Sequence, residues 1–238
     1  MDNVFRNFDK DIKSLHNADF MRYLREEILD TTSSQILDDI IRQTNVYVFS
    51  GVTRDYFLKR QSKHRDIDIV LEQDINWWDI YRRHRRHIKA RINSYGGIKA
   101  QIGTLSIDLW TMKRTWGIVR KGIRNTPHNL LRTAFFNFST VAYCINKERF
   151  YIHKNFARFI NQREIDIQYK DNPNVPLCIV NTMYYSQLLQ MPISAALKEW
   201  IVSRYSIFDN YETPQLSHWG VVKYSHEEIH SFVSQCGL

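Results

Sequence analysis

The sequence predicts an α+β fold in which a mixed β-sheet is flanked by helices and followed by a small C-terminal helical region. Residues 46–71 have the pattern of a strand, a small-residue turn, a helix and a second strand. Residues 97–102 and 104–111 alternate apolar and polar side chains, as half-buried strands do. Apolar residues recur at helical spacing in residues 1–45 and 177–204. The predicted strands are 46–50, 66–71, 97–102 and 104–111.

The N-terminal segment is expected to form helices that lead into the first strand. Leu24 and Ile28 form one apolar stripe, and residues 36–41 form another. Thr31–Ser34 lie between them and supply residues that cap helices, so a break is expected there.

The turn after the first strand and the start of the second strand combine two features of a phosphate-transfer site. Ser50 and Gly51 let the backbone approach a phosphate, and the following helix would direct its first N–H groups toward it. Asp66 and Asp68 are two residues apart, so an extended strand puts both carboxylates on one face. Such carboxylates repel each other unless a cation relieves them, and Mg²⁺ prefers oxygen ligands. The segment therefore indicates phosphoryl or nucleotidyl transfer.

This segment resembles the nucleotidyltransferase superfamily that includes DNA polymerase beta, in particular the head domains of bacterial poly(A) polymerases and CCA-adding tRNA nucleotidyltransferases. Those heads carry an apolar strand, Gly-Gly-x-Val-Arg-Asp, an apolar helix and then Asp-x-Asp. The matching positions here are Ser50, Gly51, Thr53, Arg54, Asp55, Asp66 and Asp68. The resemblance extends to about residue 168 and implies a nucleotidyltransferase-type mixed sheet.

The resemblance also implies a third carboxylate on a neighbouring strand, and Asp108 lies in the middle of 104–111. If Asp108 joins Asp66 and Asp68, the site could hold two metal ions, and Asp108 could accept the proton of the acceptor hydroxyl. The alternative is a solvent-exposed Asp on a half-buried strand. Gly96-Gly97 and Gly103 are expected to form the turns on either side of the third strand.

The family motif continues with a departure that affects nucleotide binding. The heads carry Arg-Arg-Asp-Phe-Thr-Ile-Asn-Ala-Leu-Ala-Tyr, and 136–143 match its second half in pattern. Thr133, Ala134 and Phe135 replace Arg-Arg-Asp, which leaves Arg132 as the nearby arginine. Arg132 could bind the triphosphate or be a surface charge at a helix end. The nucleotide-binding residues that the resemblance implies are Ser50, Gly51, Arg54, Arg65 and Arg132. Residues 155–160 and 163–167 are expected to form a closing helix and strand.

Composition favours a polyanionic partner and gives no sign of a membrane segment. The formal net charge is +8, with a pI near 9.4. The basic centre, 77–92, is interpreted as one helix with Arg82, Arg83, Arg86 and Lys89 facing outward. That surface would contact RNA or a partner, or be a solvated helix face. No long apolar run or signal core is present, so a cytoplasmic location is expected. The three cysteines are far apart and are expected to be free thiols.

The chain is expected to divide near 171–176 into a head domain, 1–170, and a helical C-terminal region, 171–238. Residues 115–122 are interpreted as a loop, whereas Thr126-Pro127 predicts a helix start. A short helix is expected near 225–234, where His226-Glu-Glu-Ile-His230 matches a zinc-protease pattern but is interpreted as a surface helix.

The predicted function is Mg²⁺-dependent (or Mn²⁺-dependent) transfer of a nucleoside monophosphate from an NTP to an acceptor hydroxyl, with release of pyrophosphate. The acceptor is predicted to be RNA, in particular tRNA. The alternatives are modification of a small molecule or a protein, and a non-catalytic head that binds nucleotide or RNA. The base preference, the number of nucleotides added and the oligomeric state stay open.

Overall fold

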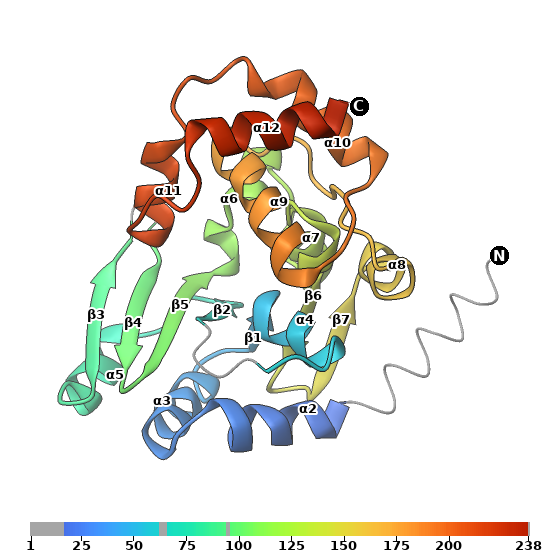
Figure 1. Ribbon diagram of the computed structural model, residues 1–238. Coiled ribbons are helices and arrows are strands. Elements are labelled where there is room, and N and C mark those ends of the chain that lie inside the picture. Colours follow the sequence, from blue (N-terminus) through green and yellow to red (C-terminus); the bar gives the residue numbers. More distant parts are fainter. Residues whose placement is uncertain (1–16, 62–65, 94–95, 238) are drawn as a thin grey trace. The chain divides into compact units, whose positions relative to one another are not determined.

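The computed structural model describes residues 17–61, 66–93 and 96–237 (Figure 1). The chain divides into two compact units, each with its own internal contacts. The first contains residues up to 134 together with 139–157, and the second contains 135–138 and 158–238. This division falls earlier in the chain than the boundary expected at 171–176. The fold is α+β, as the sequence predicts.

A seven-stranded mixed sheet forms the centre of the first unit, in the order β3-β4-β5-β2-β1-β6-β7. Neighbouring strands are antiparallel, except that β2 and β5 run parallel. The strands are β1 (Val46–Phe49), β2 (Ile67–Leu71), β3 (Ile88–Ile92), β4 (Ile98–Ile102), β5 (Leu105–Thr111), β6 (Val141–Cys144) and β7 (Arg149–Ile152). The four expected strands are confirmed, and β3, β6 and β7 are additional.

One face of the sheet packs against two short helices, α6 (Trp116–Lys121) and α7 (Pro127–Arg132). Tyr47 and Val70 face this layer, and Leu130 and Leu131 of α7 pack against them. Partly buried Phe49 also packs against this cluster. Because side chains alternate along a strand, the residues two positions from Tyr47 and Val70 share this face. These residues are Phe49 and Asp68. Asp68, the second aspartate of the Asp-x-Asp motif, therefore lies on the same face of the sheet as α6 and α7.

The opposite face packs against the N-terminal helices. Phe20 of α2 (Asn17–Tyr23) contacts Tyr143 on β6 and Phe150 on β7, with ring centroids 4.7 and 5.1 Å apart. A five-residue π-helix, η1 (Leu24–Ile28), follows α2. The next helices in the first unit are α3 (Thr31–Ile41) and α4 (Gly51–Phe57). Asp30 caps α3, and the break between the helices lies at Leu29 and Asp30, just before the expected Thr31–Ser34, which form the first turn of α3.

The helix expected over 77–92 is wrong in its second half. Helix α5 (Trp77–His84) ends at His84, and the chain then forms β3. Apolar and basic residues alternate with period two along β3, and the strand pairs with β4 over its whole length. His84 and Ile88 are spaced as on one side of a helix, but pairing with β4 makes 88–92 a strand.

Two further elements differ from expectation. Residues 116–121 form helix α6 where a loop was expected, and Gly122 ends it in the left-handed conformation that glycine favours, with φ 59°. The closing strand expected at 163–167 is reduced to isolated bridges at Ile165 and Ile167. The helix start at Thr126-Pro127 is confirmed, since Thr126 caps α7. The 3₁₀ turns are η2 (Met112–Arg114) and η3 (Asn137–Ser139).

The second unit is helical, as expected for the C-terminal region. Helix α12 packs along α10 (Figure 1). The helical range expected at 177–204 is divided at Met191-Pro192 between α9 and α10, and α11 was not expected. Gln215 of α11 is fully buried, and its amide bonds four backbone groups of the surrounding loops. The helices are α8 (Lys154–Gln162), α9 (Val175–Leu189), α10 (Ala195–Tyr205), α11 (Glu212–Trp219) and α12 (His226–Gly237).

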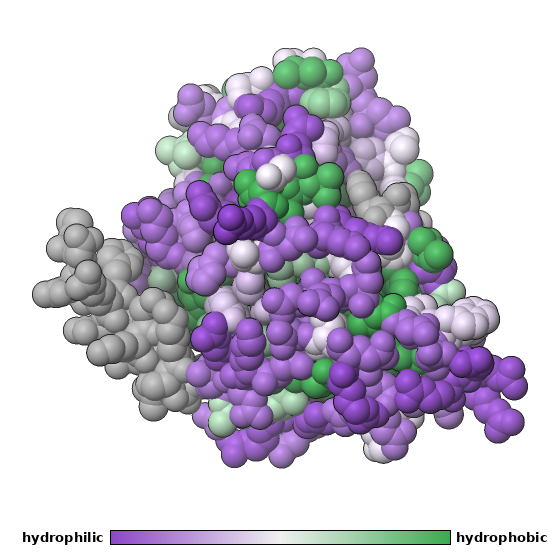
Figure 2. Space-filling model, turned by 180° about the vertical axis from the view of Figure 1, so that it is seen from behind, coloured by the Kyte–Doolittle hydropathy of each residue, from purple (hydrophilic) through white to green (hydrophobic). Residues whose placement is uncertain are grey.

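Hydrophilic residues dominate the face shown in Figure 2, with separate hydrophobic patches between them. Within the described ranges, no helix is long and apolar enough to cross a membrane.

Candidate active site

Two carboxylates meet on the parallel strand pair of the sheet. Asp68 of β2 and Asp108 of β5 are direct partners in the register of these strands. Partners in register share a face of the sheet, so both side chains lie on the same side. Asp66 directly precedes β2, and its side chain is 53% exposed, compared with 29% for Asp108. The fold therefore puts Asp68 and Asp108 side by side on one face of the sheet, with Asp66 just before the first of the two strands.

Lys99 of β4 connects two of these carboxylates. It is the register partner of Asp108, and its Nζ lies 3.4 Å from Oδ2 of Asp66 and 3.6 Å from Oδ2 of Asp108. The Lys99 side chain is 34% exposed. Ion pairs this open to solvent contribute about 0–1 kcal/mol each. Another cation could therefore replace Lys99 at the carboxylates, or a phosphate could draw Lys99 away from them, at little cost in free energy.

The donor chemistry of this cluster fits a hard divalent cation. Among the described residues, no three His, Cys, Asp or Glu side chains lie close enough together to hold a metal ion. Mg²⁺ does not need such a cage, because it is commonly bound by one or two carboxylates together with water and substrate phosphates. Asp68 and Asp108 supply two carboxylates from adjacent strands. A metal-binding role for Asp66, Asp68 and Asp108 stays a prediction.

The turn beside the carboxylates has an unusual backbone. Ser50 has φ 55° and ψ −103°, a region that residues with a side chain rarely adopt. Hydrogen bonds to neighbouring segments and within α4 hold it there, among them one that the Arg54 backbone N–H donates to the Ser50 carbonyl at 2.7 Å. The Ser50 N–H donates to the Val141 carbonyl at 3.0 Å, its Oγ donates to Ser139 Oγ at 2.9 Å, and Thr53 Oγ1 donates to the Ser50 carbonyl at 2.6 Å. Such conformations cost about 1–3 kcal/mol and occur preferentially at functional sites.

The Ser50 turn lies next to the carboxylates because of the strand register. Phe49 is the register partner of Asp68, and Ser50 follows Phe49 directly. Gly51 begins helix α4 and is buried. The turn and the paired carboxylates therefore come from neighbouring strands.

Arg54 lies inside the protein. Its side chain is 1% exposed, and it forms an ion pair with Asp55, with Nε 2.8 Å and Nη2 2.6 Å from Oδ1. An enclosed guanidinium does not reach a nucleotide in this conformation. Removing one partner of a buried pair typically costs about 3–5 kcal/mol, so Arg54 holds the α4 turn together.

Two further nucleotide-binding residues were predicted, Arg132 and Arg65. Arg132 is exposed in the last turn of α7. Arg65, like Lys63, lies outside the described residues. Thr133 is buried and donates to the Leu130 carbonyl. It also packs so closely on Gly117 of α6 that a Cβ there would lie 2.5 Å from the Thr133 Cβ. Where the related heads carry their first arginine, this chain has a core residue.

No family model matches the sequence, and no curated protein matches it either. Solved structures do resemble its fold. The apo form of a CCA-adding enzyme aligns with 90% of this chain and 53% of its own, at TM-score 0.64 and 17% identity. Its complex with CTP aligns at TM-score 0.63 and 15% identity, over 91% and 54% of the chains. A tRNA nucleotidyltransferase complexed with a primer tRNA and an incoming ATP analog aligns at TM-score 0.54 and 18% identity, over 73% and 49%.

The chain has a nucleotidyltransferase fold. At these identities the likeness shows the fold alone, and it agrees with the family resemblance of the Ser50–Asp68 segment. The chain spans about half the length of the proteins in these structures.

Two residues of this candidate site, Lys99 and Ser139, were not predicted from the sequence. Lys99 could have been found, because a hairpin closing at Gly103 pairs 102 with 105 and therefore 99 with 108. Ser139 could not, because its bond to Ser50 joins segments far apart in the sequence.

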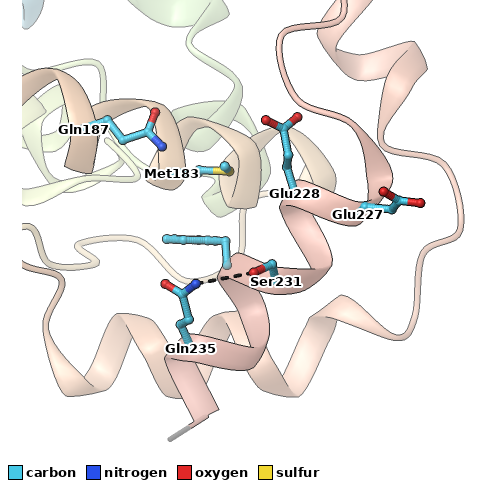
Figure 3. A pocket seen from close by; sticks show the side chains of 7 residues that line it. Met183, Gln187, Glu227, Glu228, Ser231 and Gln235 are labelled. Atoms are coloured by element: carbon cyan, nitrogen blue, oxygen red, sulfur yellow. Dashed lines mark hydrogen bonds between the residues drawn. The ribbon is translucent and has the colours of Figure 1, made fainter.

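The second unit has a hollow of about 410 Å³ that is separate from the carboxylates and the Ser50 turn. Figure 3 shows Met183 and Gln187 of α9 on one side and residues of α12 on the other, with Gln235 donating to Ser231 at 3.4 Å. Glu227 and Glu228 line it without a basic side chain, so it does not suit a triphosphate. His226 lies in the same exposed helix, where its Nε2 contacts the Tyr205 hydroxyl at 3.4 Å.

Proposed function

We propose that this chain transfers a nucleoside monophosphate from an NTP to an acceptor hydroxyl on RNA, with tRNA as the first acceptor class to test, in a reaction that depends on Mg²⁺ or Mn²⁺. The observation that supports this most directly is the pairing of Asp68 with Asp108 across two parallel strands. Lys99 contacts both Asp66 and Asp108. The strained turn at Ser50 comes directly after Phe49, the register partner of Asp68.

Each group has a role in this proposal. Asp66, Asp68 and Asp108 would hold the divalent cation, which supplies neutralisation of phosphate charge and a lowered pKa for the attacking hydroxyl. Asp108 would accept the proton of that hydroxyl as its oxygen bonds to the α-phosphorus and pyrophosphate leaves. The backbone at Ser50 and Gly51 would contact the triphosphate. Lys99 would move from the carboxylates to a phosphate oxygen, because both are anions within the reach of its flexible chain.

Charge supports RNA as the acceptor class. The formal net charge is +8, which favours a polyanion. One structure with this fold is described as complexed with a primer tRNA and an incoming ATP analog.

The test is transfer of label from each α-labelled NTP to total tRNA in the presence of Mg²⁺. Wild type should label RNA with a preferred base. Asp66→Asn/Asp68→Asn should lose at least roughly a hundred- to thousandfold of the rate, because the cation and the phosphate charge it neutralises lose their ligands. Asp74→Asn is the matched control, since Asp74 lies just after the other end of β2 and pairs with Lys113 away from the cluster.

Three results would count against parts of this proposal. Equal transfer by wild type and the double variant would exclude the carboxylate site. NTP binding and pyrophosphate release without labelled RNA would redirect the acceptor to a small molecule or a protein. Absence of NTP binding would contradict catalysis.

A non-catalytic head that binds nucleotide or RNA is the second candidate, and two observations favour it. Arg54 is enclosed, and Thr133 is a core residue where related heads carry an arginine. This candidate predicts binding of RNA or NTP by wild type with no turnover.

A further inference from the structure

The sheet extends beyond the carboxylates as an open polar face formed by β3, β4 and β5. Because strand partners share a face, Arg91, Lys99 and Asp108 form one row across these strands. A second row, Lys89, Gln101 and Ser106, runs beside it on the same face. The alternate residues of the three strands face the other side and are nearly all apolar.

This face is accessible and positively charged at its outer edge. Lys89, Arg91 and Gln101 are exposed, and Lys99, Ser106 and Asp108 are half-buried. Neither Lys89 nor Arg91 makes an ion pair with any residue in the described part of the chain. Positive charge at β3 therefore gives way to negative charge at β5 and β2 along one continuous surface.

The cations of the preceding helix differ in this respect. Arg82 of α5 pairs with Asp79, and Arg83 pairs with Asp39 at 3.0 Å. Those pairs neutralise part of the basic helix that the sequence suggested as a surface for RNA. The unneutralised charge that lies in line with the active site is on β3.

We infer that the 3′-terminal strand of an RNA acceptor lies across this β3–β4 face, with its phosphates on Lys89 and Arg91 and its terminal hydroxyl at Asp108. The inference rests on the proposed function. Neighbouring strands are about 4.8 Å apart, so Arg91 is roughly 10 Å from Asp108 across the sheet. At about 3.4 Å per stacked nucleotide, that distance corresponds to about three nucleotides from the 3′ end.

The chemistry of the face defines how the RNA is read. Lysine, arginine, glutamine and serine side chains are typical ligands of phosphate and sugar groups. The two rows contain no aromatic side chain on which a base could stack. Contacts to the backbone alone carry no sequence information, so this face binds the acceptor without base preference.

Binding of a labelled single-stranded oligoribonucleotide and of total tRNA tests the inference at several salt concentrations, with NTP binding measured in parallel. Lys89→Gln/Arg91→Gln should weaken RNA binding by the order of tenfold at low salt and reduce the slope of log K against log salt by about 1.4. NTP binding should not change, because the variant does not alter the carboxylates or the Ser50 turn.

The matched control is Lys147→Gln/Lys154→Gln, which removes two exposed charges near β6 and β7, at the opposite edge of the sheet. It should keep wild-type affinity and slope. Equal weakening by both double variants would overturn the inference, because only total charge would then matter. If wild type binds NTP but no RNA, the inference is also overturned. Nucleotidyl transfer to an acceptor other than RNA would then still be compatible with the result. Loss of NTP binding in wild type would instead contradict the proposed function.

Discussion

At the scale of single residues, Lys99 is the informative position of the site. Its ammonium contacts Asp66 and Asp108, the carboxylates proposed to hold the cation. A metal ion that binds without a nucleotide has to displace the Lys99 ammonium from the carboxylates. A nucleotide can instead form an ion pair between one of its phosphates and Lys99. Lys99 therefore opposes one ligand and favours the other, which a residue needed only for folding would not do.

Lys99→Met should change two affinities in opposite directions. Mn²⁺ binding without nucleotide, measured by electron paramagnetic resonance, should tighten by roughly three- to tenfold, because two exposed ion pairs of up to about 1 kcal/mol are removed. NTP binding without metal should weaken by a similar factor. Lys113→Met is the control, since Lys113 pairs with Asp74 outside the cluster, and neither affinity should change. A parallel fall of both affinities would assign Lys99 a structural role only.

The burial of Arg54 shows a limit of motif matching. The residue matches the family arginine in sequence, yet its side chain is 1% exposed and pairs with Asp55. Burial by the surrounding fold, which a local motif does not contain, decides whether a charged side chain faces a ligand. The orientation of Asp68 is easier to predict from the sequence, because strand alternation alone sets the face on which its side chain lies.

At the scale of elements, hairpin β4–β5 was predictable and β3 was not. Gly103, with φ 58°, fixes the turn, and the alternation on either side fixes the faces. Residues 88–92 also alternate, but the basic helix before them has a stripe that continues in phase to Ile88. The end of α5 depends on pairing with β4, which a local pattern does not contain.

The cap of α3 predicts a pH dependence. Ser33 N–H donates to Asp30 Oδ1 at 2.7 Å, and this bond is the main reason why the pKa of Asp30 is lowered from 3.8. A lowered folded-state pKa stabilises the fold above the unfolded pKa, and that stabilisation is lost as the pH falls through the folded value.

Asp30→Ala should lower the free energy of unfolding by about 1 kcal/mol at pH 7, measured by urea denaturation. Asp30→Asn keeps an oxygen acceptor and should lose less. The advantage of wild type over the Asn variant should shrink between pH 5 and pH 3. An advantage that stays constant over this range would show that the Asp30 charge does not stabilise the cap.

At the scale of the whole molecule, the sequence indicated the α+β class, the carboxylate site and the helical C-terminal region. The division into units was less accessible, because 135–138 is grouped with residues after 157 instead of its sequence neighbours. Phe135 illustrates why, since its ring packs 5.0 Å from that of Trp200 in the second unit. Long-range aromatic contacts of this kind leave no periodic signal in the sequence.

The three free cysteines provide a probe of each unit. Cys144 in the first unit and Cys178 in the second are buried, and burial raises the pKa of both thiols. Cys236 in the second unit is only half-buried, although burial raises its pKa as well. The thiolate is the reactive form, so a raised pKa and poor access both slow alkylation.

Iodoacetamide should therefore modify Cys236 in the native protein and reach Cys144 and Cys178 only as their units unfold. Mass spectrometry of digested protein at increasing urea would measure the order. Modification of all three at the same rate without urea would contradict the burial that the structure describes.

The parallel pairing of β2 with β5 has a consequence for how the protein is made. Helix α5 and strands β3 and β4 all lie between Asp68 and Asp108 in the chain. A parallel pair cannot close through a tight turn, so this whole crossover must be synthesised and folded before the two carboxylates meet. Pairings of such long range form late and slowly. Two of the bonds that hold the Ser50 turn go to Ser139 and Val141, which follow Asp108 in the chain. A chain still emerging from the ribosome would therefore pair its carboxylates before its Ser50 turn was held in place, and the candidate site would be complete only once β6 had been made.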